Sequence, residues 1–427
     1  MGLSAGQPAR RAAQAALSEV LRKRRPIDAA LAAATGLDPR DAGFARVIAS
    51  ETLRRLGQLE ALIRVFVPKS PARNRAGSVP EILLAGACEL LFLDVPAHAA
   101  VDGANRLAQS DDKAVHFKPL INAVLRRVDR EGRAVIAAQD AARLNTPDWL
   151  WQRWSEAYGE TTAREIAEAH QGVPPLDIVA KDTIDMADAE FLFGKVYRLK
   201  ESARVDALPG YAEGAFWVQD AAATLPPLLL GEVRGRTVID LCAAPGGKTA
   251  QLAAAGAKVI AVERDAARME QLKTNLQRLN LEAEFVADDA RDWRPAAPAP
   301  YVLLDAPCSA TGTIRRHPEL PWIKNASDVT LCSQAAGELI DAAAEMTAVD
   351  GLLVFAVCSL EREEGPEQVD AFLHRRPDFA RMAVRPGELF GHAEFVDANG
   401  DLRTLPCHLA EHGGMDGFYA ARLRRSS

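Results

Sequence analysis

The sequence lacks the features that mark membrane, secreted and zinc-binding proteins. No stretch approaches the about eighteen uninterrupted apolar residues of a membrane span. The first residues, Met1 to Arg11, contain no apolar core of a secretory signal, so a cytoplasmic location is predicted. The 6 cysteines form no CxxC pair and lie near no histidine cluster, which predicts free thiols in a reducing compartment and no metal site.

Charge is distributed unevenly along the 427 residues. The net charge is −7, yet residues 1–140 hold 21 Lys and Arg against 15 Asp and Glu, while residues 141–427 hold 30 against 43. A basic front part on an acidic body indicates a polyanionic partner that the front part contacts. A solvated helical surface accounts for the same imbalance equally well, so charge alone leaves both interpretations open.

Three domains are predicted from the way apolar residues repeat. Residues 1–138 are all-helical, with apolar side chains at helical spacing such as Leu56 and Leu59. Residues 139–215 form a small α+β connector, and residues 216–427 alternate short apolar strands with amphipathic helices. That alternation predicts a largely parallel, doubly wound α/β sheet of the Rossmann-like kind. Its strands are expected at 237–241, 258–263, 283–287, 301–305 and 352–359, and ligands bind at the carboxyl ends of such strands.

The first predicted strand runs into a turn of small residues and then into a helix. The turn consists of Cys242, Ala243, Ala244, Pro245, Gly246, Gly247 and Lys248. Small residues let a backbone approach a ligand closely, and the free N–H groups of a helix start favour an anionic group. The turn matches neither the phosphate-binding GxxxxGK[ST] loop nor the dinucleotide-binding GxGxxG pattern. A nucleoside that carries a carboxylate, such as S-adenosylmethionine, suits the turn, and the alternative is a plain tight turn.

Acidic residues follow the next two predicted strands. Glu263 closes the second strand, where a carboxylate can accept hydrogen bonds from both hydroxyls of a ribose. Arg268 lies just downstream and is assigned to the same cofactor site. Asp289 follows the third strand, at the place expected for an adenine amino group, with Asp288 as a rival for that role. Each acidic residue alone is more often a solvated loop end, but their order on successive strands favours one shared site.

Two cysteines end the fourth and fifth predicted strands. Asp305, Ala306, Pro307 and Cys308 end the fourth strand, and Cys358 ends the fifth. Enzymes that methylate amino nitrogens commonly carry Asn/Asp-Pro-Pro-aromatic at the first of these places, so a cysteine there indicates chemistry at carbon. Carbon 5 of a pyrimidine becomes nucleophilic once a thiolate adds at carbon 6, and Asp305 is placed to hydrogen-bond the N3/N4 edge of a cytosine. The residues themselves do not decide which cysteine attacks, and buried packing is the alternative for both.

These motifs resemble those of the NOL1/NOP2/Sun family of RNA cytosine-5 methyltransferases. They are CAAPGGK at 242–248, DAPCSATGTIRRHPE at 305–319, VCS at 357–359 and VQD at 218–220. The resemblance is strong over 216–425 and weak over 1–140, where it implies an all-helical RNA-binding domain like the antitermination factor NusB. Two positions depart from the family pattern: Ala310 stands where glycine is usual, and Val357 where threonine is usual.

The resemblance also implies the role of each site residue. Cys358 is expected to be the nucleophile and Cys308 to promote product release. The 242–248 loop, Glu263, Arg268, Asp289 and Asp305 are expected to contact the cofactor or the target base, with Lys248 and Asp305 also counted as catalytic. Arg315, Arg316 and His317 fall in a loop near the expected substrate face, where they are predicted to contact phosphates.

The predicted activity is methyl transfer from S-adenosylmethionine to carbon 5 of a cytidine in RNA. The expected partner is 16S ribosomal RNA or a ribosomal assembly intermediate, and the protein is expected to act as a cytoplasmic monomer without a metal ion or a membrane. Two alternatives remain open: the same reaction on transfer RNA, and a non-catalytic RNA-binding adapter. Retention of both cysteines together with Lys248 and Asp305 argues against the adapter.

Overall fold

The chain folds into two compact units. The computed structural model describes residues 6–69, 73–182, 186, 188–200 and 204–426. One unit, here called the helical unit, comprises Met1–Gly172 and Ile314–Asn325, and the other, the sheet unit, comprises Val173–Thr313 and Ala326–Ser427. Among the described residues, no helix is both long enough and apolar enough to cross a membrane.

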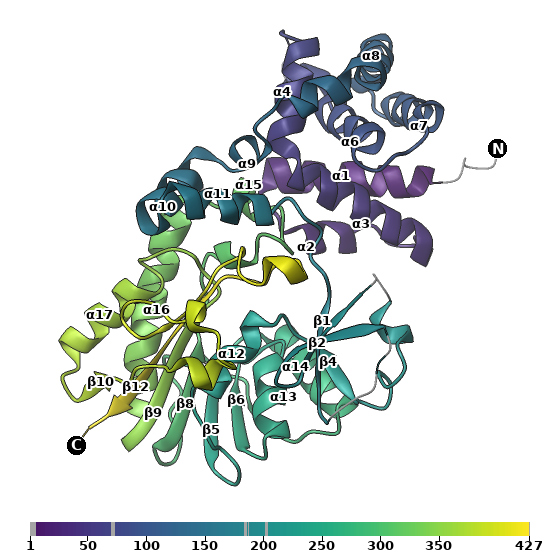
Figure 1. Ribbon diagram of the computed structural model, residues 1–427. Coiled ribbons are helices and arrows are strands. Elements are labelled where there is room, and N and C mark those ends of the chain that lie inside the picture. The colour runs from purple at the N-terminus through teal and green to yellow at the C-terminus, as the bar shows by residue number, and fades with distance from the viewer. Residues whose placement is uncertain (1–5, 70–72, 183–185, 187, 201–203, 427) are drawn as a thin grey trace. The chain divides into compact units, whose positions relative to one another are not determined.

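The described residues of the helical unit form helices and no strand (Figure 1), as predicted for residues 1–138; residues 139–172, predicted within an α+β connector, contribute helices to it as well. Its most buried helix is α6, in which every residue except Pro80 is buried, and a helix that is apolar on most of its circumference belongs in the centre of a bundle. Gly86 of α6 allows a close approach, because a Cβ atom there would lie 2.8 Å from Leu125 Cδ1. The helices are α1 Gln7–Lys23, α2 Ile27–Ala32, α3 Pro39–Arg54, α4 Leu56–Phe66, α5 Arg73–Ala76, α6 Val79–Leu91, α7 Ala97–Gln109, α8 Lys118–Ala137, α9 Ala141–Leu144, α10 Asp148–Tyr158, α11 Glu160–Ala169 and α15 Leu320–Ile323.

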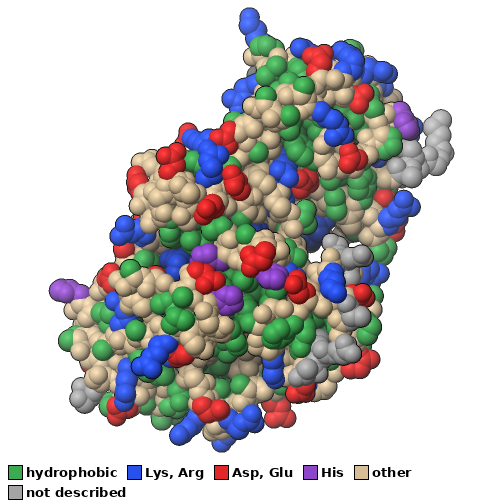
Figure 2. All heavy atoms as spheres, viewed as in Figure 1, with side chains coloured by type: hydrophobic (Ala, Val, Ile, Leu, Met, Phe, Trp, Pro, Cys, Tyr) green, Lys and Arg blue, Asp and Glu red, His purple; other side chains and the backbone are tan. Residues whose placement is uncertain are grey.

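Local ion pairs engage some of the basic side chains of the helical unit. Figure 2 shows Lys and Arg side chains interspersed with Asp and Glu over its visible face. Arg106 Nε lies 2.9 Å from Asp102 Oδ2 one turn earlier on α7, and Arg127 Nε lies 2.9 Å from Glu131 Oε2 on α8. Exposed pairs at this spacing add little stability, but they lower the positive potential that an RNA would meet.

A segment from the methyltransferase-like half of the sequence completes the helical unit. Residues 314–325, which contain α15, belong to this unit by their contacts. Trp322 Nε1 donates a hydrogen bond to the Leu53 carbonyl at 2.9 Å, and Arg24 Nε donates to the Ile323 carbonyl at 2.7 Å. The segment includes the last six residues of the predicted 305–319 motif, so that part of the motif belongs to the helical unit.

The sheet unit contains two sheets. The smaller has the strand order β2-β3-β1-β4, and the larger has the order β10-β12-β9-β8-β5-β6-β7, with β11 paired to β12. Strands β5 to β9 pair in parallel and β12 joins β9 antiparallel, which confirms the predicted α/β class. The strands are β1 Asp177–Ala180, β2 Ala189–Phe193, β3 Val196–Leu199, β4 Phe216–Val218, β5 Thr237–Leu241, β6 Lys258–Val262, β7 Glu284–Val286, β8 Ala299–Asp305, β9 Thr347–Val357, β10 Phe379–Arg381, β11 Leu402–Thr404 and β12 Phe418–Arg425.

Helices cover both faces of the larger sheet (Figure 1). Successive side chains of a strand point to opposite faces, so Val238 packs in one core cluster and Ile239 in another. The first cluster includes residues of α12 Leu225–Leu228, α13 Gly247–Ala254 and α14 Ala266–Arg278, and the second those of α16 Ala326–Met346 and α17 Pro366–Arg375. The chain passes from β5 to β6 and β7, then returns to β8 and β9 on the other side of β5. Ligands bind at this reversal in doubly wound sheets.

The smaller sheet is anchored by a buried arginine. Arg198 on β3 is 3% exposed. Its guanidinium donates to both carboxylate oxygens of Asp177 at 2.6 and 2.8 Å, and to the carbonyls of His412 and Gly414 at 2.6 and 2.8 Å. Burial raises the pKa of Asp177, and the hydrogen bonds from Arg198 oppose that effect. Residues 173–218 are thereby tied to the chain that precedes β12, within the sheet unit.

Removal of this arginine should strongly destabilise the sheet unit. Arg198→Met leaves the buried Asp177 carboxylate without its ionic partner, and such a loss costs about 3–5 kcal/mol. The matched control is Arg204→Met, whose partner Asp206 is 57% exposed, and a surface pair of this kind contributes little stability. Urea unfolding of both variants measures the difference, and equal losses of free energy would contradict an anchoring role for Arg198.

Candidate active site at the carboxyl ends of β5, β8 and β9

The predicted site residues converge at one edge of the larger sheet. Strand β5 ends at Leu241, which pairs with Leu304 of β8, and Asp305 at the end of β8 pairs with Ala356 of β9. The small-residue turn, the Asp305–Cys308 segment and Cys358 therefore all leave the sheet at neighbouring carboxyl ends. Parallel strands bring these segments together although they are far apart in the sequence.

The turn after β5 has the conformation that its small residues favour. Cys242 has φ 59° and Gly246 has φ 102°, both in the left-handed region, and Gly246 caps the start of α13. Arg268 Nη2 donates to the Ala244 carbonyl at 2.6 Å, so this arginine holds the turn itself. Burial raises the pKa of Cys242 to about 12, which leaves its thiol protonated and unreactive.

Glu263 retains an oxygen that can receive a ligand. Its side chain is 3% exposed, and its Oε1 accepts a hydrogen bond from the Asp265 amide at 2.9 Å. Its Oε2 is buried and accepts no hydrogen bond from any residue that the structure describes, with Arg268 Nη1 3.5 Å away. A buried carboxylate oxygen needs a donor, and a ribose hydroxyl of a bound nucleoside would satisfy it.

Asp289 is engaged by arginines. Arg291 Nε and Nη2 donate to its two oxygens at 3.0 and 2.7 Å, and Arg264 Nη1 lies 3.4 Å from Oδ2. These hydrogen bonds, those of Arg291 first, hold the pKa of Asp289 well below its usual range. Asp288 Oδ1 accepts from the Asp289 amide at 2.8 Å. An adenine contact by either carboxylate stays a prediction.

Lys248 and Asp305 form an ion pair across two strand ends. Lys248 Nζ lies 2.7 Å from Asp305 Oδ2, and the side chains are 10% and 29% exposed. The same ammonium lies 4.8 Å from the centre of the Phe418 ring on β12. The pair fixes the start of α13 against the end of β8 and leaves Asp305 partly open to a ligand.

The two predicted cysteines are in contact. Cys308 Sγ lies 3.5 Å from Cys358 Sγ, and both residues are partly exposed. The hydrogen bond with Cys358, followed by burial, raises the pKa of Cys308 well above its usual range. Ala310, two residues later, has φ 61°, a left-handed conformation that glycine adopts at lower cost than alanine. This conformation explains why a glycine suits that position.

The sequence alone does not single out Glu364. It lies in a run of charged residues, 361–364, which is usually a solvated surface. In the structure it is fully buried and accepts hydrogen bonds from Ser309 and Ser359, the residues that directly follow the two cysteines. No periodicity or motif signals such a contact, because it joins side chains on two separate loops.

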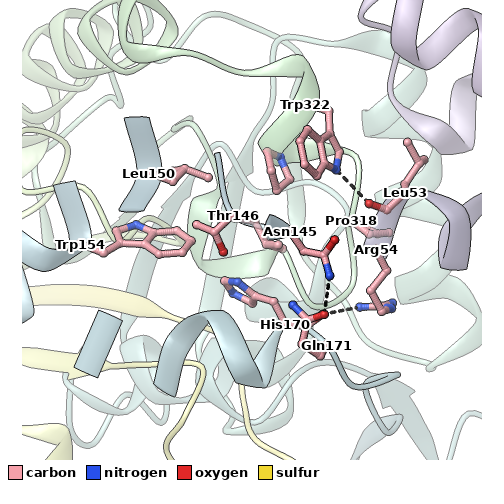
Figure 3. Close-up of a pocket in the computed structure, with 12 residues that line it drawn as sticks. Leu53, Arg54, Asn145, Thr146, Leu150, Trp154, His170, Gln171, Pro318 and Trp322 are labelled. Atoms are coloured by element: carbon pink, nitrogen blue, oxygen red, sulfur yellow. Dashed lines mark hydrogen bonds between the residues drawn. The ribbon is translucent and has the colours of Figure 1, made fainter. Parts of the chain in front are cut away.

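A crevice in the helical unit is lined by none of the residues predicted to bind the cofactor or to act in catalysis. Figure 3 shows Arg54, Asn145, Trp154, His170 and Trp322 around it. Burial lowers the pKa of His170 to about 3, so its imidazole is neutral. The sheet-unit site is therefore the candidate active site.

The prediction that Arg315 contacts phosphates is wrong for this structure. Arg315 is 1% exposed, and its carbonyl accepts a hydrogen bond from Arg54 Nη1 at 2.9 Å. The neighbouring His317 is largely buried as well, and burial lowers its pKa to about 4. The helical unit takes up this segment because Leu320 and Ile323 bury apolar side chains in it. Arg316 is exposed.

Two protein families match separate parts of the chain. The family described as 16S rRNA methyltransferase RsmB/F matches residues 227–424, and the NusB family matches residues 7–130. Among solved structures, PH0851 superposes with a TM-score of 0.75 at 22% identity and covers 100% of both chains. NSun6 from Pyrococcus horikoshii has a TM-score of 0.55 at 17% identity and covers 66% of this chain and 98% of its own. At these identities, the two structures show the fold alone.

Relatives of higher identity extend over nearly the full length. Ribosomal RNA small subunit methyltransferase B of Pseudomonas putida is 36% identical, with 97% of this chain and 98% of the relative covered. The protein of the same name from Vibrio cholerae is 34% identical, with 97% of each chain covered. With such identity over both units and with methyltransferase motifs at the sheet edge, the chain belongs to the ribosomal RNA small subunit methyltransferase B family of RNA methyltransferases.

Proposed function

We propose that the protein transfers a methyl group from S-adenosylmethionine to carbon 5 of a cytidine in RNA, with 16S ribosomal RNA as the target. The observation that carries this proposal is the pair of thiols of Cys308 and Cys358, which lie 3.5 Å apart. They lie at the same sheet edge as the small-residue turn at 242–248, which suits a nucleoside cofactor. The relatives named as methyltransferases of small-subunit ribosomal RNA support RNA as the substrate.

Two thiols suit carbon 5 because that atom must first be activated and then restored. A thiolate that bonds to carbon 6 moves the electrons of the carbon 5–carbon 6 double bond to carbon 5, which then bonds to the methyl carbon. S-adenosylmethionine supplies that methyl group as an electrophile on sulfur, and the sulfur–methyl bond breaks. A base next takes the proton from carbon 5, the double bond re-forms, and the attacking sulfur leaves as a thiolate.

We assign attack to Cys358 and release to Cys308. The resemblance to the NOL1/NOP2/Sun family supports this order, and the raised pKa of Cys308, caused by its hydrogen bond with Cys358 and by burial, is compatible with it. Once Cys358 is bonded to carbon 6, its hydrogen bond and its charge no longer act on Cys308, and the pKa of Cys308 falls. Cys308 then gives its proton to solvent more readily and can take the proton of carbon 5.

The remaining residues hold the cofactor and the base. The turn at 242–247 is assigned to close contact with the cofactor, and the spare Oε2 of Glu263 to its ribose hydroxyls. Asp305, as the ionised partner of Lys248, acts as an acceptor and is assigned to the N4 amino group of the cytosine. Lys248 orients that carboxylate, and Arg268 stabilises the turn through its hydrogen bond to the Ala244 carbonyl.

Alanine substitution of each cysteine should block a different step of the reaction. The Cys308→Ala variant can still form the bond between Cys358 and carbon 6 but cannot release the RNA, so it is expected to accumulate a covalent protein–RNA complex that survives denaturing gel electrophoresis. Cys358→Ala lacks attack and is expected to form no complex and to transfer no methyl group. The measurement uses tritium-labelled S-adenosylmethionine with total RNA, followed by mapping of the methylated cytidine.

The control for both variants is Cys332→Ala on α16, which is expected to behave like the native protein. A complex that forms with Cys358→Ala and not with Cys308→Ala would reverse the roles assigned here. If the native protein labels no RNA at all, the proposed function fails.

Loss of the Glu263 charge should weaken cofactor binding. Glu263→Gln replaces one carboxylate oxygen by an amide that donates, so a hydrogen bond to a charged acceptor is lost. This change is expected to weaken binding of S-adenosylhomocysteine about 10- to 100-fold, as measured by calorimetry. The control Glu270→Gln alters an α14 carboxylate that is 70% exposed and should leave the affinity unchanged. Native affinity in Glu263→Gln would remove Glu263 from the cofactor site.

A further inference from the structure

Glu364 is a buried carboxylate beside the cysteine pair. It lies in the turn between β9 and α17, six residues after Cys358, and is 0% exposed. A buried carboxylate is costly unless its oxygens accept hydrogen bonds. The donors that surround Glu364 therefore indicate what it contributes.

Three hydrogen bonds to Glu364 come from residues that directly follow a cysteine. The Ser309 amide donates to Oε1 at 2.7 Å, and Ser309 Oγ donates to Oε2 at 2.6 Å. Ser359 Oγ also donates to Oε2. One carboxylate thus joins the loop that carries Cys308 to the loop that carries Cys358. A glutamate accepts at both oxygens, whereas a glutamine would turn an N–H group toward one of these donors.

The sheet positions Cys358 more directly than Cys308. The pairing of β8 with β9 ends at Asp305 and Ala356, where the Ala306 amide donates to the Ala356 carbonyl at 2.9 Å. Cys358 lies one residue beyond the end of β9, but Cys308 lies three residues beyond the end of β8. The place of the Cys308 sulfur therefore depends on bonds made by its own loop, in which Ser309 donates two hydrogen bonds to Glu364.

The Cys358 loop has supports that do not involve Glu364. Arg403, which is 8% exposed, donates from Nη1 to the Ser359 carbonyl at 2.7 Å. Bonds from Thr311 and Gly312 also join the two loops, but they lie three and four residues beyond Cys308: the Leu360 amide donates to Thr311 Oγ1 and the Gly312 amide to the Cys358 carbonyl, each at 3.0 Å. Loss of the Glu364 carboxylate should therefore loosen the part of the loop at Ser309, next to Cys308, while the bond from Arg403 still holds the Cys358 loop.

We propose that Glu364 is a positioning residue that holds Cys308 against Cys358 for the release step, an inference that rests on the proposed function. It acts through Ser309 and does not touch the reacting atoms. Its negative charge also contributes, after Cys358 and burial, to the raised pKa of Cys308. A higher proton affinity makes Cys308 a stronger base toward the proton of carbon 5.

The test compares formation and decay of the covalent complex in Glu364→Gln. With in vitro-transcribed 16S ribosomal RNA and labelled S-adenosylmethionine, complex formation is expected to stay within about twofold of native, whereas decay should slow about 10- to 100-fold. Because a nearby negative charge is removed, the pKa of Cys308 falls, and the rise of the decay rate with pH should move to lower pH. A merely structural role would slow both steps together and leave the pH profile unchanged.

Matched variants separate positioning from misfolding. Glu367→Gln alters a carboxylate three residues along the chain that is 49% exposed and should behave like the native protein. Ser309→Ala removes one donor to Glu364 while its backbone remains, and it should slow decay about threefold. If circular dichroism shows that Glu364→Gln is unfolded, Ser309→Ala decides: slower decay supports the inference, and native decay overturns it.

The Cys308→Ala variant distinguishes failure of this inference from failure of the proposed function. The double variant Cys308→Ala/Glu364→Gln should accumulate no more complex than Cys308→Ala alone, because Glu364 acts through Cys308. If Cys308→Ala accumulates complex but Glu364→Gln releases RNA at the native rate, only the role of Glu364 is overturned. If Cys308→Ala forms no complex while the native protein still methylates RNA, the roles assigned to the cysteines and the role of Glu364 are overturned together, whereas native protein that labels no RNA overturns the proposed function.

Discussion

The parallel pairing of β8 with β9 is the constraint on which the site depends. Its last backbone hydrogen bond, from the Ala306 amide to the Ala356 carbonyl at 2.9 Å, sets two chain segments side by side as they leave the sheet. Cys308 and Cys358 follow within three residues, and their sulfurs reach 3.5 Å. Two thiols at van der Waals distance influence each other's protonation, so the backbone geometry determines the chemical difference between them.

Around this pair, polar side chains hold the loops that extend beyond the ends of the strands. Lys248 pairs with Asp305 at 2.7 Å, and Glu364 bonds both serines that follow the cysteines. Buried charges seldom add stability compared with apolar side chains of the same size. Their contribution here is geometric, because a carboxylate with fixed donors leaves a loop fewer conformations than apolar packing does.

Strongly periodic elements were predictable from the sequence, and contacts between loops were not. Strand β5 was predicted at its observed bounds, because a short apolar run between turn residues has few alternatives. Residues 314–325 include the end of the 305–319 motif but lie in the helical unit, and Arg315 is buried there instead of facing phosphates. Glu364 lies in a charged run whose burial no periodicity reveals.

The sequence by itself determined the helical and α/β classes, the small-residue turn at 242–248 and the placement of two cysteines at strand ends. These features are local, since each depends on residues within about ten positions of one another. The tertiary structure alone decided that the two sulfurs touch, that Glu263 keeps an unused acceptor and that Glu364 bridges the cysteine loops. Such contacts join residues about fifty positions apart, and their distances depend on strand register and on the packing of whole loops, which no local pattern encodes.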